Sequence, residues 1–175
     1  MSVSSAKMSV LVGEHFACVK ITGRANFTSS MDFKTLLNEL RQRGFERFVL
    51  DLSQCMLMDS TFLGVLAGFG LKLCAAQKEP RCPGLELLNP SARITELLEN
   101  LGVLQLFTIR SGPLLTPADT PTPVLAPADA SPEELTRTCL EAHQTLMKIN
   151  PDNIARFKDV AQFLAEDLKR LEAAK

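Results

Sequence analysis

The sequence lacks the residues and patterns from which most metal and redox sites are built. It has 175 residues but only two histidines, His15 and His143, and its five cysteines include no C-x-x-C pair. The histidines are far apart, and neither has a cysteine or histidine nearby at ligand spacing, which argues against a metal site. An odd number of scattered cysteines is typical of reduced, mostly buried thiols in a cytosolic protein.

Motifs for catalysis and for phosphate binding are also missing. Ser60 has no G-x-S-x-G frame, and with so few histidines we expect no general base beside it. Gly64, Gly68 and Gly70 lie inside a helical run rather than in a strand-to-helix turn, so they do not form a phosphate loop. The sequence therefore predicts no enzyme, no catalytic residue and no cofactor.

Charge and hydropathy give no sign of a nucleic-acid or membrane partner. The net charge is −1, and the densest basic group, Arg41, Arg43 and Arg47, has no interleaved aromatic residues on which bases could stack. The longest apolar run, residues 62–73, is shorter than the roughly 20 residues that span a bilayer. Residues 1–10 lack the apolar core of a signal peptide. We expect a cytoplasmic protein without membrane insertion.

What the sequence does contain, up to about Arg110, is an alternation of strand and helix patterns. With 46% apolar residues the chain can bury a real core. The expected strands lie within residues 8–23 (two strands joined by a turn), 47–52, 85–89 and 104–110, and the expected helices within 27–44, 60–77 and from 90 onward. The run at 47–52 is continuous and apolar, as in a strand buried on both faces. This order predicts a small α/β domain with helices packed on a mixed sheet of four or five strands.

The remainder of the chain changes character. Residues 112–130 are rich in Pro, Thr and Ala and read as an extended linker after a domain at 1–111. Residues 131–175 predict a helical hairpin, whose start carries Ser131 as N-cap and proline at the next position. Its second helix has a narrow apolar seam. We expect the hairpin to dock on itself, on a second copy or on a partner, since the long linker does not favour packing on its own domain alone.

The short polar segment Asp59-Ser60-Thr61 stands directly before the apolar run. Asp and Ser are preferred N-cap residues, so one of them is expected to cap the helix at 60–77. The segment also follows a strand and loop, where small α/β domains present working groups. A phosphate on a hydroxyl at a helix N-terminus is stabilised by the free N–H groups there. Ser60 could therefore be a helix cap or the site of a phosphorylation switch.

These residues resemble the signature of the STAS domain of bacterial anti-sigma-factor antagonists. The shared features are the apolar strand that ends in Asp-Leu-Ser (51–53), then Asp-Ser-Thr-x-Leu-Gly (59–64) at the start of an apolar helix. The resemblance covers residues 8–110, and the C-terminal hairpin lies outside it. It implies partner switching: the unphosphorylated domain binds an anti-sigma factor that is also a serine kinase, and a phosphatase restores the domain after phosphorylation. The implied phosphoacceptor is Ser60.

The resemblance also implies a partner-binding surface and shows two departures from the family pattern. We expect Asp59, Thr61 and Phe62 to contribute to it, with Arg24 and Asn26 from the turn after the second strand. Phe62 stands where such antagonists usually have glycine. The turn 23–26 reads Gly-Arg-Ala-Asn, where they often carry Gly-Glu-x-Asp. Both changes alter the surface that a kinase would recognise.

Two other functions remain open from the sequence. In one, the chain is a constitutive scaffold or assembly subunit that binds through residues 131–175, and Ser60 merely caps its helix. In the other, the apolar helix and Phe62 line a pocket for a lipid-like ligand, although no pattern of polar groups supports it.

Overall fold

The computed structural model describes residues 6–77, 85–113, 122–123 and 130–175. Its strands are β1 (Lys7–Val12), β2 (Phe16–Ala25), β3 (Arg47–Met58), β4 (Leu85–Leu88), β5 (Thr108–Arg110) and β6 (Thr122–Pro123). Its helices are α1 (Phe27–Gln42), α2 (Ser60–Gln77), α3 (Ala92–Asn100), α4 (Pro132–Ile149) and α5 (Asp152–Ala173), with a short 3-10 helix at Leu104–Leu106. The predicted chain break at Pro80, Pro83 and Gly84 and most of the predicted linker lie outside the described residues.

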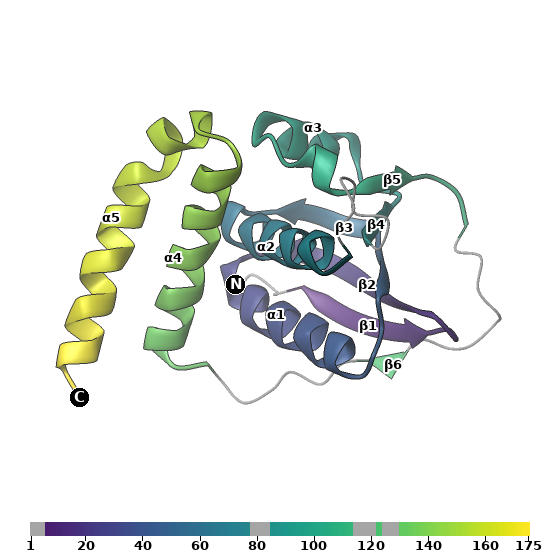
Figure 1. Ribbon diagram of the computed structural model, residues 1–175, viewed down its shortest axis with the longest axis horizontal. Coiled ribbons are helices and arrows are strands. Elements are labelled where there is room, and N and C mark those ends of the chain that lie inside the picture. Colours follow the sequence, from purple (N-terminus) through teal and green to yellow (C-terminus); the bar gives the residue numbers. More distant parts are fainter. Residues whose placement is uncertain (1–5, 78–84, 114–121, 124–129) are drawn as a thin grey trace.

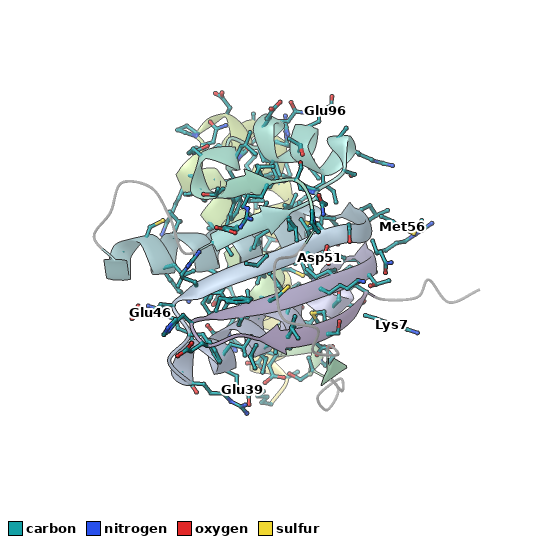
Figure 2. The ribbon with its side chains drawn as sticks, turned by 90° about the vertical axis from the view of Figure 1, so that its right-hand side faces the viewer. Lys7, Glu39, Glu46, Asp51, Met56 and Glu96 are labelled. Atoms are coloured by element: carbon teal, nitrogen blue, oxygen red, sulfur yellow. The ribbon has the colours of Figure 1, made fainter. Side chains whose placement is uncertain are left out.

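The strands form one mixed sheet in the order β5-β4-β3-β2-β1-β6. β1 pairs antiparallel with β2 and β6, whereas β2, β3, β4 and β5 are parallel neighbours. Helices α1, α2 and α3 connect the parallel strands. Helices α1 and α2 cover one face of the sheet (Figure 1). The other face, which carries Asp51, is not covered by helices (Figure 2). The predicted α/β fold is confirmed, with the two-residue β6 added at one edge.

The core fills the space between the sheet and its helices. In β3, Phe48, Leu50 and Leu52 point into it and are at most 1% exposed. The apolar stripe of α1 contributes Phe33 and Leu37, as its spacing predicts. Because every second residue of a strand faces the same side, the interior set of β3 leaves Asp51 and Ser53 on the open face.

The structure corrects four sequence expectations about strands and one about cysteines. β3 is covered on one face only, and it continues through residues 53–58, which had been predicted as a loop. Residues 104–106 form a 3-10 helix, so the last strand is shorter than predicted. Thr122–Pro123, inside the predicted linker, pairs with β1. Cys18, Cys55 and Cys139 are free and buried as expected, but Cys74 is disulfide-bonded.

The two C-terminal helices form the predicted hairpin, and α4 packs against the α/β domain. Ser131 caps α4 in a capping box with Glu134, as the sequence predicts. α4 lies across α2 and α1, and α5 lies on the outer side of α4 (Figure 1). Leu146 of α4 is fully buried and belongs to the core of the domain. The hairpin thus packs on its own domain, which the sequence did not favour, and its docking on a second copy or on a partner stays a prediction.

Candidate functional site at the start of helix α2

The carboxyl ends of β2 and β3 lie side by side and bring two helix starts together. Ala25 pairs with Met58 in the parallel register of the two strands. The Asp59 N–H donates to the Ala25 carbonyl at 2.9 Å, which fixes the two loops against each other. Helices α1 and α2 begin within two residues of this point, as expected for working groups at the carboxyl edge of a parallel sheet.

Asp59 caps α2 and also holds the start of α1. One carboxylate oxygen accepts from the Phe62 N–H at 2.8 Å, and the other accepts from the Phe27 N–H at 2.7 Å. A carboxylate is stabilised at both places because the free N–H groups at a helix start carry partial positive charge. Asp59 is thus the N-cap, and Ser60 is the first residue of the helix. The suggestion that Ser60 caps α2 is wrong.

Asn26 caps α1, and Arg24 is exposed beside it. The Asn26 side chain accepts from the Ser29 N–H at 3.4 Å, and the Ser29 hydroxyl donates back to the Asn26 carbonyl at 2.9 Å. Arg24 is on the solvent side of β2, so its place on a partner surface stays a prediction.

Thr61 and Phe62 face inward rather than toward a partner. Phe62 is 0% exposed and stacks on Phe33, with ring centroids 4.4 Å apart and an angle of 20° between the rings. Thr61 is 5% exposed. Their side chains therefore cannot form part of an accessible contact surface in this structure, which corrects the expectation for both. Phe62, which departs from the family pattern, is therefore part of the core.

Ser60 is half-buried, and its hydroxyl is bound by a histidine of the C-terminal hairpin. Ser60 Oγ lies 2.9 Å from His143 Nε2, and His143 Nδ1 lies 2.7 Å from the Cys139 carbonyl oxygen. A carbonyl can only accept, so Nδ1 carries the hydrogen, and Nε2 of the neutral ring accepts from the serine hydroxyl. The ring is 5% exposed and lies edge-on to Phe157 of α5, with centroids 5.1 Å apart.

The prediction that no base lies beside Ser60 is therefore wrong, because packing of α4 brings in His143 from 83 residues away. The pair has the spacing of an activated nucleophile and its base. However, a carbonyl of its own helix orients the ring, and the ring is buried between helices. The groove of about 290 Å³ between α1, α2 and α4 is lined by neither residue. We therefore assign a structural role to the contact between Ser60 and His143.

Neighbouring contacts continue this interface along α4. The pKa of the Cys139 thiol is raised, mainly by burial. The thiol is also hydrogen-bonded to Thr61. The Thr138 hydroxyl lies 2.7 Å from the sulfur of Met31 in α1. A Cβ placed on Gly64 would lie 2.6 Å from the Cβ of Ala142, so glycine allows α2 and α4 to approach this closely. The sequence offered one signal, a histidine on the apolar face of α4, but gave no indication of its partner.

The sequence model of the STAS domain matches residues 7–112. The chain belongs to this family. The match covers strands β1 to β5 and helices α1 to α3, and the STAS domain ends before the hairpin that supplies His143. No curated protein sequence matches the chain.

Solved structures similar to this chain have low sequence identity to it. A candidate anti-sigma factor antagonist from Thermotoga maritima is 17% identical, with a TM-score of 0.52 over 59% of this chain and 85% of its own. An anti-sigma factor antagonist from Mycobacterium paratuberculosis is 17% identical, with a TM-score of 0.49 over 66% and 91%. SpoIIAA of Bacillus in its phosphorylated form is also 17% identical, with a TM-score of 0.48 over 59% and 90%.

Among the described residues, no helix is both long and apolar enough to cross a bilayer. The same part of the chain brings together no group of three His, Cys, Asp or Glu side chains suited to a metal ion.

Proposed function

We propose that this chain is a non-enzymatic, cytoplasmic partner-switching regulator whose STAS domain binds an anti-sigma factor that is also a serine kinase. Phosphorylation of Ser60 by that kinase ends the complex, and a phosphatase restores it. The observation that supports this function is the position of Ser60 on the first turn of α2, at the loop edge of the sheet and directly after Asp59. No nucleic-acid or membrane contact enters the proposal.

The electrostatics of this position suit a switch. A phosphate on Ser60 would gain from the positive end of α2 but would add about two negative charges beside the Asp59 carboxylate. Arg24 and Asn26 stand next to it as candidate partner contacts. Exposed apolar side chains lie on neighbouring segments, with Phe27 at 46% and Met56 at 64% exposure, and Met56 projects from the sheet in Figure 2. Such side chains suit the centre of a protein interface.

The proposal is tested first by phosphosite mapping of the protein isolated from its own cells, grown with and without stress. A phosphate on Ser60 whose occupancy changes with condition is the expected result. Co-purification then compares variants of the full chain: Ser60→Asp is expected to lose the kinase, and Ser60→Ala to retain it. Ser60 unmodified in every condition, or equal retention by both variants, would contradict the proposal.

A second candidate function is favoured by the bond between Ser60 and His143. If this contact is permanent, the chain is a constitutive scaffold or assembly subunit in which Ser60 only holds the hairpin in place. Residues 131–175 are then the part through which the assembly forms, on its second copy or on a partner. This alternative predicts that no condition places a phosphate on Ser60.

A further inference from the structure

The hairpin covers the phosphoacceptor proposed above. α4 crosses the first turns of α2, so Ser60, Thr61 and Gly64 all lie against it (Figure 1). The face of α2 beside Ser60 is therefore occupied by a segment of the same chain. A partner that reads the Ser60 hydroxyl must reach the place where α4 now lies.

A phosphate on Ser60 does not fit while α4 is docked. The serine hydroxyl and the imidazole are at hydrogen-bond distance, 2.9 Å, so a tetrahedral phosphoryl group would have to occupy the place of the ring. The ring cannot turn aside easily, since the Cys139 carbonyl holds Nδ1 and the ring also packs edge-on against Phe157. The Asp59 carboxylate, fixed by two N–H donors, would also face the added charge.

The hairpin is built as a unit that can move away from the domain. Its two helices are held together by Arg137, which pairs with Glu133 at 2.8 Å and with Glu172 at 3.0 Å. Lys175 also pairs with Glu133. None of these ion pairs involves the STAS domain, so they survive if α4 leaves it.

The attachment of the hairpin to the domain combines polar and apolar contacts. Asn153 donates to the Leu101 carbonyl and to the Leu146 carbonyl, both at 2.9 Å, and so ties the hairpin to the end of α3. Lys34 of α1 pairs with Glu141 of α4 at 3.3 Å on the surface. The buried side chain of Leu146, the hydrogen bonds of Cys139 and Ser60, and the close contact at Gly64 also join α4 to the domain.

We infer that the α4–α5 hairpin is an intramolecular competitor for the Ser60 face: the partner binds the unphosphorylated chain by displacing the docked hairpin, and a phosphate on Ser60 releases it. This inference rests on the proposed function only in taking Ser60 as the phosphoacceptor. In the transfer, Ser60 Oγ forms a bond to the γ-phosphorus of a nucleoside triphosphate held by the kinase. The bond to the nucleoside diphosphate breaks, and the hydroxyl proton leaves to a base of the kinase or to water. The kinase acts on the open form, and the phosphate keeps it open.

The test uses Cys139 as a built-in reporter. Cys139 belongs to α4, its thiol is hydrogen-bonded to Thr61 of α2, and the residue is 9% exposed, whereas Cys18 and Cys55 lie within the STAS domain at 2% and 5%. Pulsed alkylation with iodoacetamide, read peptide by peptide, therefore separates undocking of the hairpin from unfolding of the domain. The sample is the purified full chain with phosphoserine incorporated site-specifically at position 60. Alkylation of Cys139 is expected to rise at least tenfold (about 1.4 kcal/mol in opening free energy), with Cys18 and Cys55 unchanged. A broad-specificity serine phosphatase should restore the slow rate.

Two glycine variants provide a matched pair that needs no phosphate. Gly64→Ala places a methyl group against the backbone of Ala142 and should speed alkylation of Cys139 by a similar factor. Gly68→Ala, one turn further along the same face, meets only the Thr145 side chain at 3.8 Å and should leave the rate unchanged. Both substitutions replace glycine by a better helix former, so helix propensity does not distinguish them.

Three results would overturn the inference. The alkylation of Cys139 could be as slow with phosphoserine at position 60 as without it. The alkylation rates of Cys18 and Cys55 could rise in parallel with that of Cys139, which would mean that the domain unfolds. Gly64→Ala and Gly68→Ala could also give the same rate. None of these depends on whether cells phosphorylate Ser60, so failure of this inference and failure of the proposed function are seen in different experiments.

Discussion

The substitution that best tests the placement of Phe62 is Phe62→Ala. Its ring is 0% exposed and stacks on Phe33 between α1 and α2. Truncating a fully buried phenylalanine costs about 3–5 kcal/mol, of which the stacked pair accounts for roughly 0.5–1.5 kcal/mol. Phe62→Gly, which restores the residue usual in the family, should cost about 1 kcal/mol more because glycine is a poor helix former. These losses are large beside a total stability of about 5–15 kcal/mol.

The assay is urea unfolding followed by far-UV circular dichroism, since the chain has no Trp or Tyr to report by fluorescence. Phe27→Ala is the matched control: it is the same side chain at the start of the neighbouring helix α1, but 46% exposed. It should change stability by no more than about 0.5–1 kcal/mol. If Phe62→Ala cost less than about 1 kcal/mol, or if both variants cost the same, Phe62 would not be a core residue and the packing argument would be wrong.

Three further predictions concern the cap, a buried thiol and the hairpin anchor. Asp59→Ala should lower the free energy of unfolding, measured in urea, by about 2 kcal/mol: roughly 1 kcal/mol for the N-cap and roughly 1 kcal/mol for the hydrogen bond from the Phe27 N–H. Asp59→Asn should lower it by less. Burial, with Asp51 as a smaller cause, raises the pKa of Cys18 from its usual 9.0 to about 11. Its contribution to stability is therefore present below pH 9.0 and lost as pH rises toward about 11; Cys18→Val should flatten that decline in alkaline unfolding curves. Both variants lose the two hydrogen bonds that Asn153 donates, but Asn153→Asp should open the hairpin more than Asn153→Ala, because a buried carboxylate would face two carbonyl oxygens and be repelled by them; peptide-resolved alkylation measures the order.

Periodicity predicted most of the fold because it reports which face of each element is buried. The stripe of α1 and the seam of α5 follow directly from residue spacing. The end of β3 could not be read this way, since Ser53 and Gln54 look like a loop. In the structure these residues lie on the exposed side of a strand whose Cys55 and Met58 still point inward. Strand length there is set by pairing with β2 through Ala25, which is a tertiary constraint.

The site was predictable in its position but not in its bonding. A polar segment before an apolar helix correctly located the carboxyl edge of the sheet. Which residue became the cap depended on Asp59 reaching two helix starts at once, and one of them belongs to α1, 32 residues earlier. Phe62 was taken for a surface residue because the family usually has glycine there, whereas the fold uses the ring to fill space beside Phe33.

The hydrogen bond between Ser60 and His143 is too weak for its loss alone to release the hairpin. A net hydrogen bond contributes about 1 kcal/mol, which changes the ratio of docked to open hairpin only about fivefold. Moving a population from mostly docked to mostly open requires about 5.5 kcal/mol. Ser60→Ala should therefore leave Cys139 nearly as protected as in the unmodified chain, while phosphoserine, which adds both volume and charge against a buried ring, should not. If Ser60→Ala opened the hairpin as fully as the phosphate, the hydroxyl would be the main support of α4, and phosphorylation would have no special role in releasing it.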